Sequence, residues 1–167
     1  MPRTRLVKCS VSLCNMQDDD TYPRSSSRKY GSPLPNEWPV IEPPGAVRIA
    51  IVGSMPTKNE DYYSKLFIGE AGKFLDAGLG KEGLVRAQCL LCNVSWVRSE
   101  RGYLDEFEWD GNEVQCSLRH LAEDLEKFDP TIVLCLGNEA LHVMKVGNVD
   151  PGRKKGLFNW PHKIQTA

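Results

Sequence analysis

The stretch IAIVGSMPTKNED (49–61) decides the fold. Its first half is a run of apolar and β-branched residues that ends at Gly53, which is the pattern of a buried strand. Its second half carries a proline, small polar residues and two adjacent acids, Glu60 and Asp61, which is typical of a loop. We therefore expect a strand over 47–53 with a polar loop above its carboxyl end.

Strands and helices alternate along the rest of the chain. Such alternation predicts a three-layer α/β/α sandwich with a short, mainly parallel central sheet. Ligands of such sheets bind beyond the carboxyl ends of the strands, so the loops after Val52, Ser95 and Leu136 should share one rim. The apolar patterns predict helices over 71–79, 113–128 and 138–147, strands over 87–96 and 131–137, and the start of a fourth strand over 163–166.

Composition indicates one globular domain. The 167 residues are 41% hydrophobic and 26% charged with a net charge of −1, which excludes a strong overall field toward nucleic acid. Residues 1–46 are expected to form an irregular arm, and residues 47–167 an α/β domain. Because no apolar run approaches the roughly 20 residues of a membrane helix, and no signal-type block begins the chain, we expect a soluble, monomeric intracellular protein. It would lie in the cytoplasm or nucleoid, and a viral origin is left open.

Four residues of the expected rim each allow two interpretations. Glu60 and Asp61 are either surface charges or catalytic carboxylates. Phe67, in a segment with a nearby glycine, is either a packed aromatic or a stacking platform. Asn93 ends an apolar run, and a buried Asn needs partners, so it is either a structural clamp or a reader of a ligand edge. The loop lacks the G-x-x-x-x-G-K-[ST] and G-x-G-x-x-G patterns, which makes a nucleotide cradle a weak interpretation.

The segment VRIAIVGSMPTKNEDYYSKLFIGEAGKFLD (47–76) resembles the first motif region of the uracil-DNA glycosylase superfamily. It is most similar to the thermophile-type, iron–sulfur branch, the fourth family, with its G-E-x-P-G-x-x-E-D and P-F-x-G-x-A-G-x-x-L-D motifs. CNVSW is similar to the T-N-V-x-K of that family. TIVLCLGNEAL and GRKKGLFNW resemble two later segments of it. The matching residues are Gly53, Pro56, Glu60, Asp61, Phe67, Gly69, Ala71, Gly72, Leu75 and Asp76.

The resemblance implies a DNA glycosylase that flips uracil or a related modified base out of DNA and hydrolyses its N-glycosidic bond. Phe67 would stack on the base, and Asn93 would bond its pyrimidine edge. Glu60 would orient the water or stabilise the developing sugar cation. Ser54 stands where the family has an acid, so catalysis would rest mainly on Glu60. The loop that would grip the uracil carbonyl or the departing anion comprises Gly53, Ser54, Met55 and Pro56.

The resemblance also implies a metal site, but its four-cysteine pattern is altered. Cys9 and Cys14 replace a C-x-x-C, the third ligand position falls near Trp96, and Cys116 lies near the fourth. With His120, one helical turn from Cys116, these residues could form a structural zinc site or hold the remnant of a [4Fe–4S] cluster. The alternative is a set of free thiols. Three other cysteines are expected to pack as small apolar side chains: Cys89, Cys92 and Cys135.

The function therefore has open alternatives. The family's H-P-S motif should follow the strand expected over 163–166, and the sequence given ends at Ala167. His162 lies before that strand and is a poor substitute. Either this sequence is a piece of a longer chain, or the protein is a catalytically inactive glycosylase-fold protein that binds DNA or a protein partner. A small-molecule enzyme using the same rim is the third hypothesis.

Overall fold

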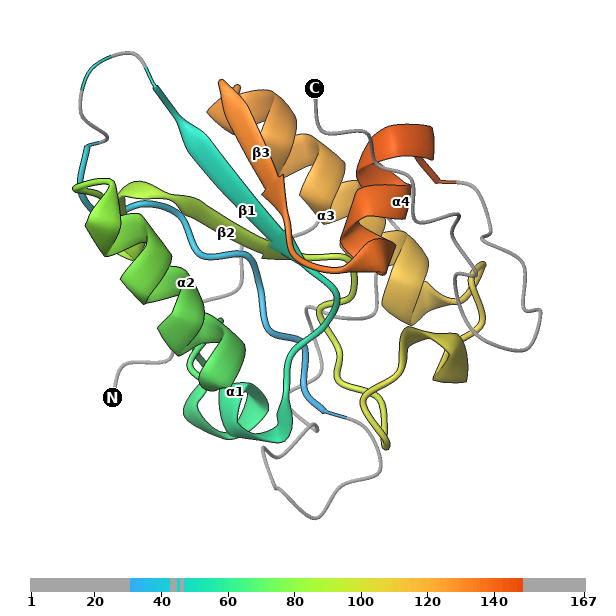
Figure 1. Ribbon diagram of the computed structural model, residues 1–167. Helices are drawn as coiled ribbons and strands as arrows, with labels where there is room; N and C mark the ends of the chain where they lie inside the picture. Colours follow the sequence, from blue (N-terminus) through green and yellow to red (C-terminus); the bar gives the residue numbers. More distant parts are fainter. Residues whose placement is uncertain (1–30, 43–44, 46, 149–167) are drawn as a thin grey trace.

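A computed structural model describes residues 31–42, 45 and 47–148 of the chain (Figure 1). Strands and helices alternate along it, as predicted. The strands are β1 (Ile49–Gly53), β2 (Leu90–Asn93) and β3 (Ile132–Cys135), the α-helices are α1 (Lys58–Tyr63), α2 (Glu70–Lys81), α3 (Asn112–Phe128) and α4 (Asn138–Val146), and two short 3-10 helices cover Arg86–Gln88 and Leu104–Glu106.

The described strands form a parallel sheet with β1 at its centre, in the order β2-β1-β3. The register pairs Gly53 with Asn93, and Val52 with Cys135. The carboxyl ends of the three strands therefore lie together, which confirms the shared rim. Beyond the ends of the strands, the Leu136 N–H still donates to the Val52 carbonyl.

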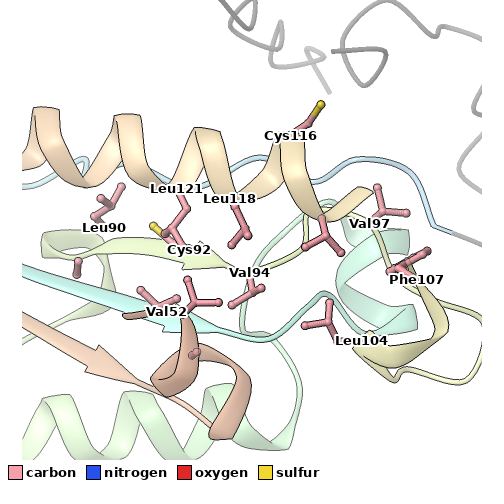
Figure 2. Close-up of a cluster of buried hydrophobic side chains, with 14 of the residues drawn as sticks. Val52, Leu90, Cys92, Val94, Val97, Leu104, Phe107, Cys116, Leu118 and Leu121 are labelled. Atoms are coloured by element: carbon pink, nitrogen blue, oxygen red, sulfur yellow. The ribbon is translucent and has the colours of Figure 1, made fainter. Parts of the chain in front are cut away.

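Helices cover both faces of this sheet (Figure 1). Ala50 and Val52 of β1 pack with buried residues of α3 and α4. Ile51 points to the other face, where it packs with Leu75 and Leu79 of α2. This alternation is the period-2 pattern of the strand, and it produces the predicted three-layer α/β/α arrangement. Figure 2 shows Leu118 and Leu121 of α3 directed at the β1–β2 side of the core.

The main departure from prediction is α1, because residues 54–61 were expected to be a loop. Thr57 caps this helix: its hydroxyl accepts from the Glu60 N–H, and the Glu60 carboxylate accepts from the Thr57 N–H. This is a capping box, and its T-x-x-E spacing is readable in the sequence. β2 is also shorter than the strand expected over 87–96, because Arg86–Gln88 forms a 3-10 turn.

The described part of the N-terminal arm runs along the free edge of β2. It has no helix, and Glu37 makes a single antiparallel bridge to Leu91. The strand expected over 163–166 lies outside the described residues. In the part of the chain that the structure describes, no helix is long and apolar enough to cross a membrane.

Candidate base-binding site

Gly53, Asn93 and Phe67 meet at the carboxyl end of β1. A Cβ added to Gly53 would lie 2.6 Å from Asn93 Oδ1 and 2.8 Å from the nearest carbon of the Phe67 ring. A side chain at position 53 would therefore displace either the amide or the aromatic ring. The sheet register places Asn93 beside Gly53, and the segment between α1 and α2 brings Phe67 over both.

Asn93 is buried without hydrogen-bond partners among the described residues. Its side chain is 1% exposed, and neither its Oδ1 nor its Nδ2 has a partner. An unsatisfied buried polar group costs about 1–3 kcal/mol, so native proteins retain few of them without a reason. Of the two interpretations of Asn93, the structural clamp is not supported, because a clamp would hold a partner.

Phe67 lies outside both neighbouring helices in a left-handed backbone conformation, with φ of 51°. A non-glycine residue in this region is strained and persists only where its surroundings hold it. Gly72 in the first turn of α2 makes room for this conformation, since a Cβ there would lie 1.6 Å from the Phe67 carbonyl oxygen. The ring itself is 8% exposed, next to Gly53 and Asn93.

Glu60 is buried and bonded to the backbone on both carboxylate oxygens. Oε2 accepts from the Thr57 N–H at 2.6 Å, and Oε1 accepts from the Phe67 N–H. It therefore fixes the start of α1 and the backbone of Phe67 at the same time. A carboxylate has further lone pairs, so Glu60 can still accept a hydrogen bond from a water. Its two existing bonds already give it a structural role.

Asp61, the second acid of the loop, forms a buried ion pair. Its Oδ2 lies 3.4 Å from Arg98 Nε, and its Oδ1 accepts from the Ser32 N–H at 3.0 Å. These contacts tie α1 to the loop after β2 and to the N-terminal arm. The interpretation of Glu60 and Asp61 as surface charges is wrong, because they are only 4% and 5% exposed.

The remaining loop residues line the carboxyl end of β1. Ser54 is half-buried, and its carbonyl accepts from the Ser95 N–H. Met55 packs against the core under α3, and Pro56 is buried. Of these, only the Ser54 hydroxyl offers a polar side chain at the rim.

A cavity of about 470 Å³ opens on the outer side of Phe67, near α2. Its lining includes Lys65, Ile68, Lys73 and Arg86. Phe67 belongs to that lining but Gly53 and Asn93 do not, so this cavity meets the Gly53–Asn93–Phe67 contact only at Phe67.

Of the four candidate metal ligands, the structure describes Cys116 and His120, which lie one turn apart on α3. Cys9 and Cys14 lie outside the described residues. The His120 ring stacks on Trp96 with centroids 4.0 Å apart, and burial lowers its pKa. In Figure 2, Cys116 points to the opposite side of α3 from Leu118 and Leu121.

Within the described residues, no three His, Cys, Asp or Glu side chains are grouped as a metal site. The third ligand position of the resemblance holds Trp96, whose indole N–H donates to Asn36. The donors among the described residues therefore do not make up a four-ligand cluster, and no chemical step proposed below uses a metal. Burial raises the pKa of the Cys89, Cys92 and Cys135 thiols, which agrees with their expected packing role.

Two residues at the site were not found from the sequence. Arg86 donates to the carbonyls of Leu66 and Phe67, and Glu37 accepts from the Leu66 N–H. Glu37 belongs to the arm and Arg86 to the turn before β2, so no local spacing connects either residue with Phe67.

Comparison with known proteins agrees with the resemblance found in the sequence. The family model described as the uracil DNA glycosylase superfamily matches residues 39–164. The type-4 uracil-DNA glycosylase of Archaeoglobus fulgidus is 33% identical over 92 residues, which cover 55% of this chain and 44% of the relative. The chain thus spans less than half the length of this curated relative. On the extent of the family match, the chain belongs to the uracil-DNA glycosylase superfamily.

Proposed function

We propose that this chain binds DNA and takes an extruded uracil, or a related modified base, between Phe67, Gly53 and Asn93, and that it hydrolyses the N-glycosidic bond. The observation that carries the proposal is the buried Asn93 side chain, whose amide oxygen and nitrogen both lack partners in the part of the chain that the structure describes. Base-flipping enzymes read an extruded base through its pyrimidine edge and by stacking.

The chemistry of an amide suits this task. Asn93 offers one acceptor and two N–H donors. The edge of uracil pairs a carbonyl with an N–H, and cytosine reverses the exocyclic group from acceptor to donor. An amide held in one orientation therefore separates the two bases. The Phe67 ring, next to the same amide, supplies an aromatic face for stacking.

Hydrolysis requires negative charge near the sugar and hydrogen-bond donors near the departing base. Water adds to the anomeric carbon, the bond to the base breaks, and the base leaves as an anion that takes up a proton. We assign the loop from Gly53 to Pro56 to the base and Glu60 to the water or the developing sugar cation. The Ser54 hydroxyl would hold the water, although it is a weak base without an activating partner.

The alternative is a catalytically inactive member of the same fold that binds DNA or a protein partner. One observation favours it: both Glu60 oxygens are already bonded to backbone N–H groups. Both oxygens are therefore already engaged in structural bonds, which leaves them less available to a water or to the sugar.

An abasic-site assay separates these functions. Purified protein is incubated with a uracil-containing oligonucleotide, and alkali-labile breaks are counted. Catalysis predicts breaks that Asn93→Ala abolishes while the variant stays folded by circular dichroism. Selective binding of uracil-containing DNA without breaks, across a panel of modified bases, would establish the non-catalytic function instead. Absence of DNA binding even at low salt would remove both DNA-directed functions and leave only the binding of a protein partner.

A further inference from the structure

Acidic and basic side chains hold every backbone polar group of the Leu66–Phe67 dipeptide. The Leu66 N–H donates to Glu37 Oε1 at 2.6 Å, and the Phe67 N–H donates to Glu60 Oε1. The Leu66 carbonyl accepts from Arg86 Nη1 at 2.9 Å, and the Phe67 carbonyl accepts from Arg86 Nη2 at 2.6 Å. Three separate parts of the chain thus bond a single dipeptide.

The arginine is itself anchored. Asp76 of α2 accepts from Arg86 Nε at 2.7 Å and from Nη2 at 2.8 Å. The Gly72 carbonyl accepts from the same Nη2 at 3.3 Å. A planar guanidinium with several fixed donors can bond a carboxylate and two successive carbonyls at once, and a lysine ammonium cannot reproduce this geometry.

We propose that Arg86 and Glu37 are positioning residues that preset Phe67 for stacking on an extruded base. The inference rests on the proposed function, because it assigns the ring to base binding. Phe67 needs support because its φ of 51° is unfavourable. Arg86 donates to the backbone carbonyl of Phe67, so it would act on a stacked base through the position of Phe67. Aromatic side chains held in place before binding lose less freedom when the base arrives.

The test is a double-mutant cycle on binding, which needs no catalysis. Fluorescence anisotropy measures affinity for an oligonucleotide carrying 2′-fluoroarabinosyl uracil, whose fluorine slows cleavage by destabilising a sugar cation. The reference is the same oligonucleotide with cytosine. Phe67→Ala should reduce the preference for uracil by roughly five- to hundredfold, the range of one stacked base. Arg86→Lys should lose most of that preference, and should add nothing in the Phe67→Ala background.

Arg48→Lys is the matched control. Arg48 makes similar bonds far from the rim, donating to the Asp129 carbonyl at 3.0 Å and to its carboxylate at 2.8 Å. This variant should keep the wild-type preference. Glu37 supplies a second test if Arg86→Lys fails to fold: Glu37→Gln retains an acceptor for the Leu66 N–H and should keep the preference, whereas Glu37→Ala should lose it.

Three results would overturn the inference. The first is a loss of uracil preference on Arg86→Lys that is equally large in the Phe67→Ala background, since the arginine would then act on general stability. The second is an equal effect of Glu37→Gln and Glu37→Ala. The third is a wild-type protein without preference for uracil. A wild-type protein that prefers uracil but leaves no abasic sites would refute the catalytic function and support the positioning role.

Discussion

Asn93→Ala should leave the fold as stable as the wild type or make it more stable. The change removes a buried oxygen and a buried nitrogen that have no partner among the described residues, and each such group costs about 1–3 kcal/mol. The small cavity that remains costs about 1–2 kcal/mol. The net change therefore runs from zero to a few kcal/mol of added stability.

Asn36→Ala is the matched comparison for the free energy of unfolding of Asn93→Ala. Asn36 is also buried, but its Nδ2 donates to Asp124 Oδ2 at 2.9 Å and its Oδ1 accepts from Trp96 Nε1 at 3.1 Å. Losing both bonds and leaving their partners unpaired should cost about 2–3 kcal/mol. The same chemical change at two buried sites should therefore have opposite effects on the free energy of unfolding.

Urea unfolding followed by circular dichroism measures both variants against the wild type. A difference of about 3 kcal/mol also corresponds to roughly 6–12 °C in melting temperature for a domain of this size. If Asn93→Ala loses as much stability as Asn36→Ala, the Asn93 amide has a structural partner, and the argument that it is reserved for a base fails. Only the Asn93 variant should lose its preference for uracil over cytosine.

Other expectations concern the loop and its supports. Ser54→Glu restores an acid at the rim and should raise the rate of abasic-site formation above wild type; an unchanged rate would show that the missing acid does not limit activity. Burial raises the pKa of Glu37 above its ordinary 4.5. The contribution of this side chain to stability is therefore full below about pH 4.5 and is lost as the pH rises through the folded-state pKa. Glu37→Gln should therefore gain stability relative to wild type as the pH rises through the folded-state pKa of Glu37. Urea titrations at several pH values measure this, and a stability difference that does not change with pH would contradict it. Gly72→Ala should destabilise the fold by several kcal/mol because the added Cβ would strike the Phe67 carbonyl. Gly78→Ala is the control, since nothing lies within 4 Å of its added Cβ, and it should gain up to about 1 kcal/mol of stability. Equal melting temperatures of the two variants would refute the close contact at Gly72.

The layered fold was predictable because its signals are local. The apolar run before Gly53 alternates between the two faces of the sheet, and the stripe on α3 faces the core. The Thr57–Glu60 capping box is equally local, since its T-x-x-E spacing indicates the start of α1, although the proline and polar residues of the same stretch also fit a loop.

The support of Phe67 could not be predicted, because it depends on long-range contacts. Glu37 lies 29 residues before Leu66, and Arg86 lies 19 residues after Phe67. Neither position shows a periodicity or a motif that singles it out. The place of Asn93 at the end of an apolar run makes it a candidate, but only the structure shows that its amide has no partner among the described residues.

The two bonds of Glu60 decide how catalysis should be tested. Replacing Glu60 would remove the N-terminal cap of α1 and a support of Phe67 along with the carboxylate charge, so a loss of activity would have three causes. Adding an acid at Ser54 has no such ambiguity, because a damaged loop can lower activity but cannot create it. A gain from Ser54→Glu would therefore show that the rim is arranged for hydrolysis and lacks only negative charge. If the variant stays folded and binds uracil-containing DNA but forms no more abasic sites than the wild type, the structural role of Glu60 is sufficient to explain its burial.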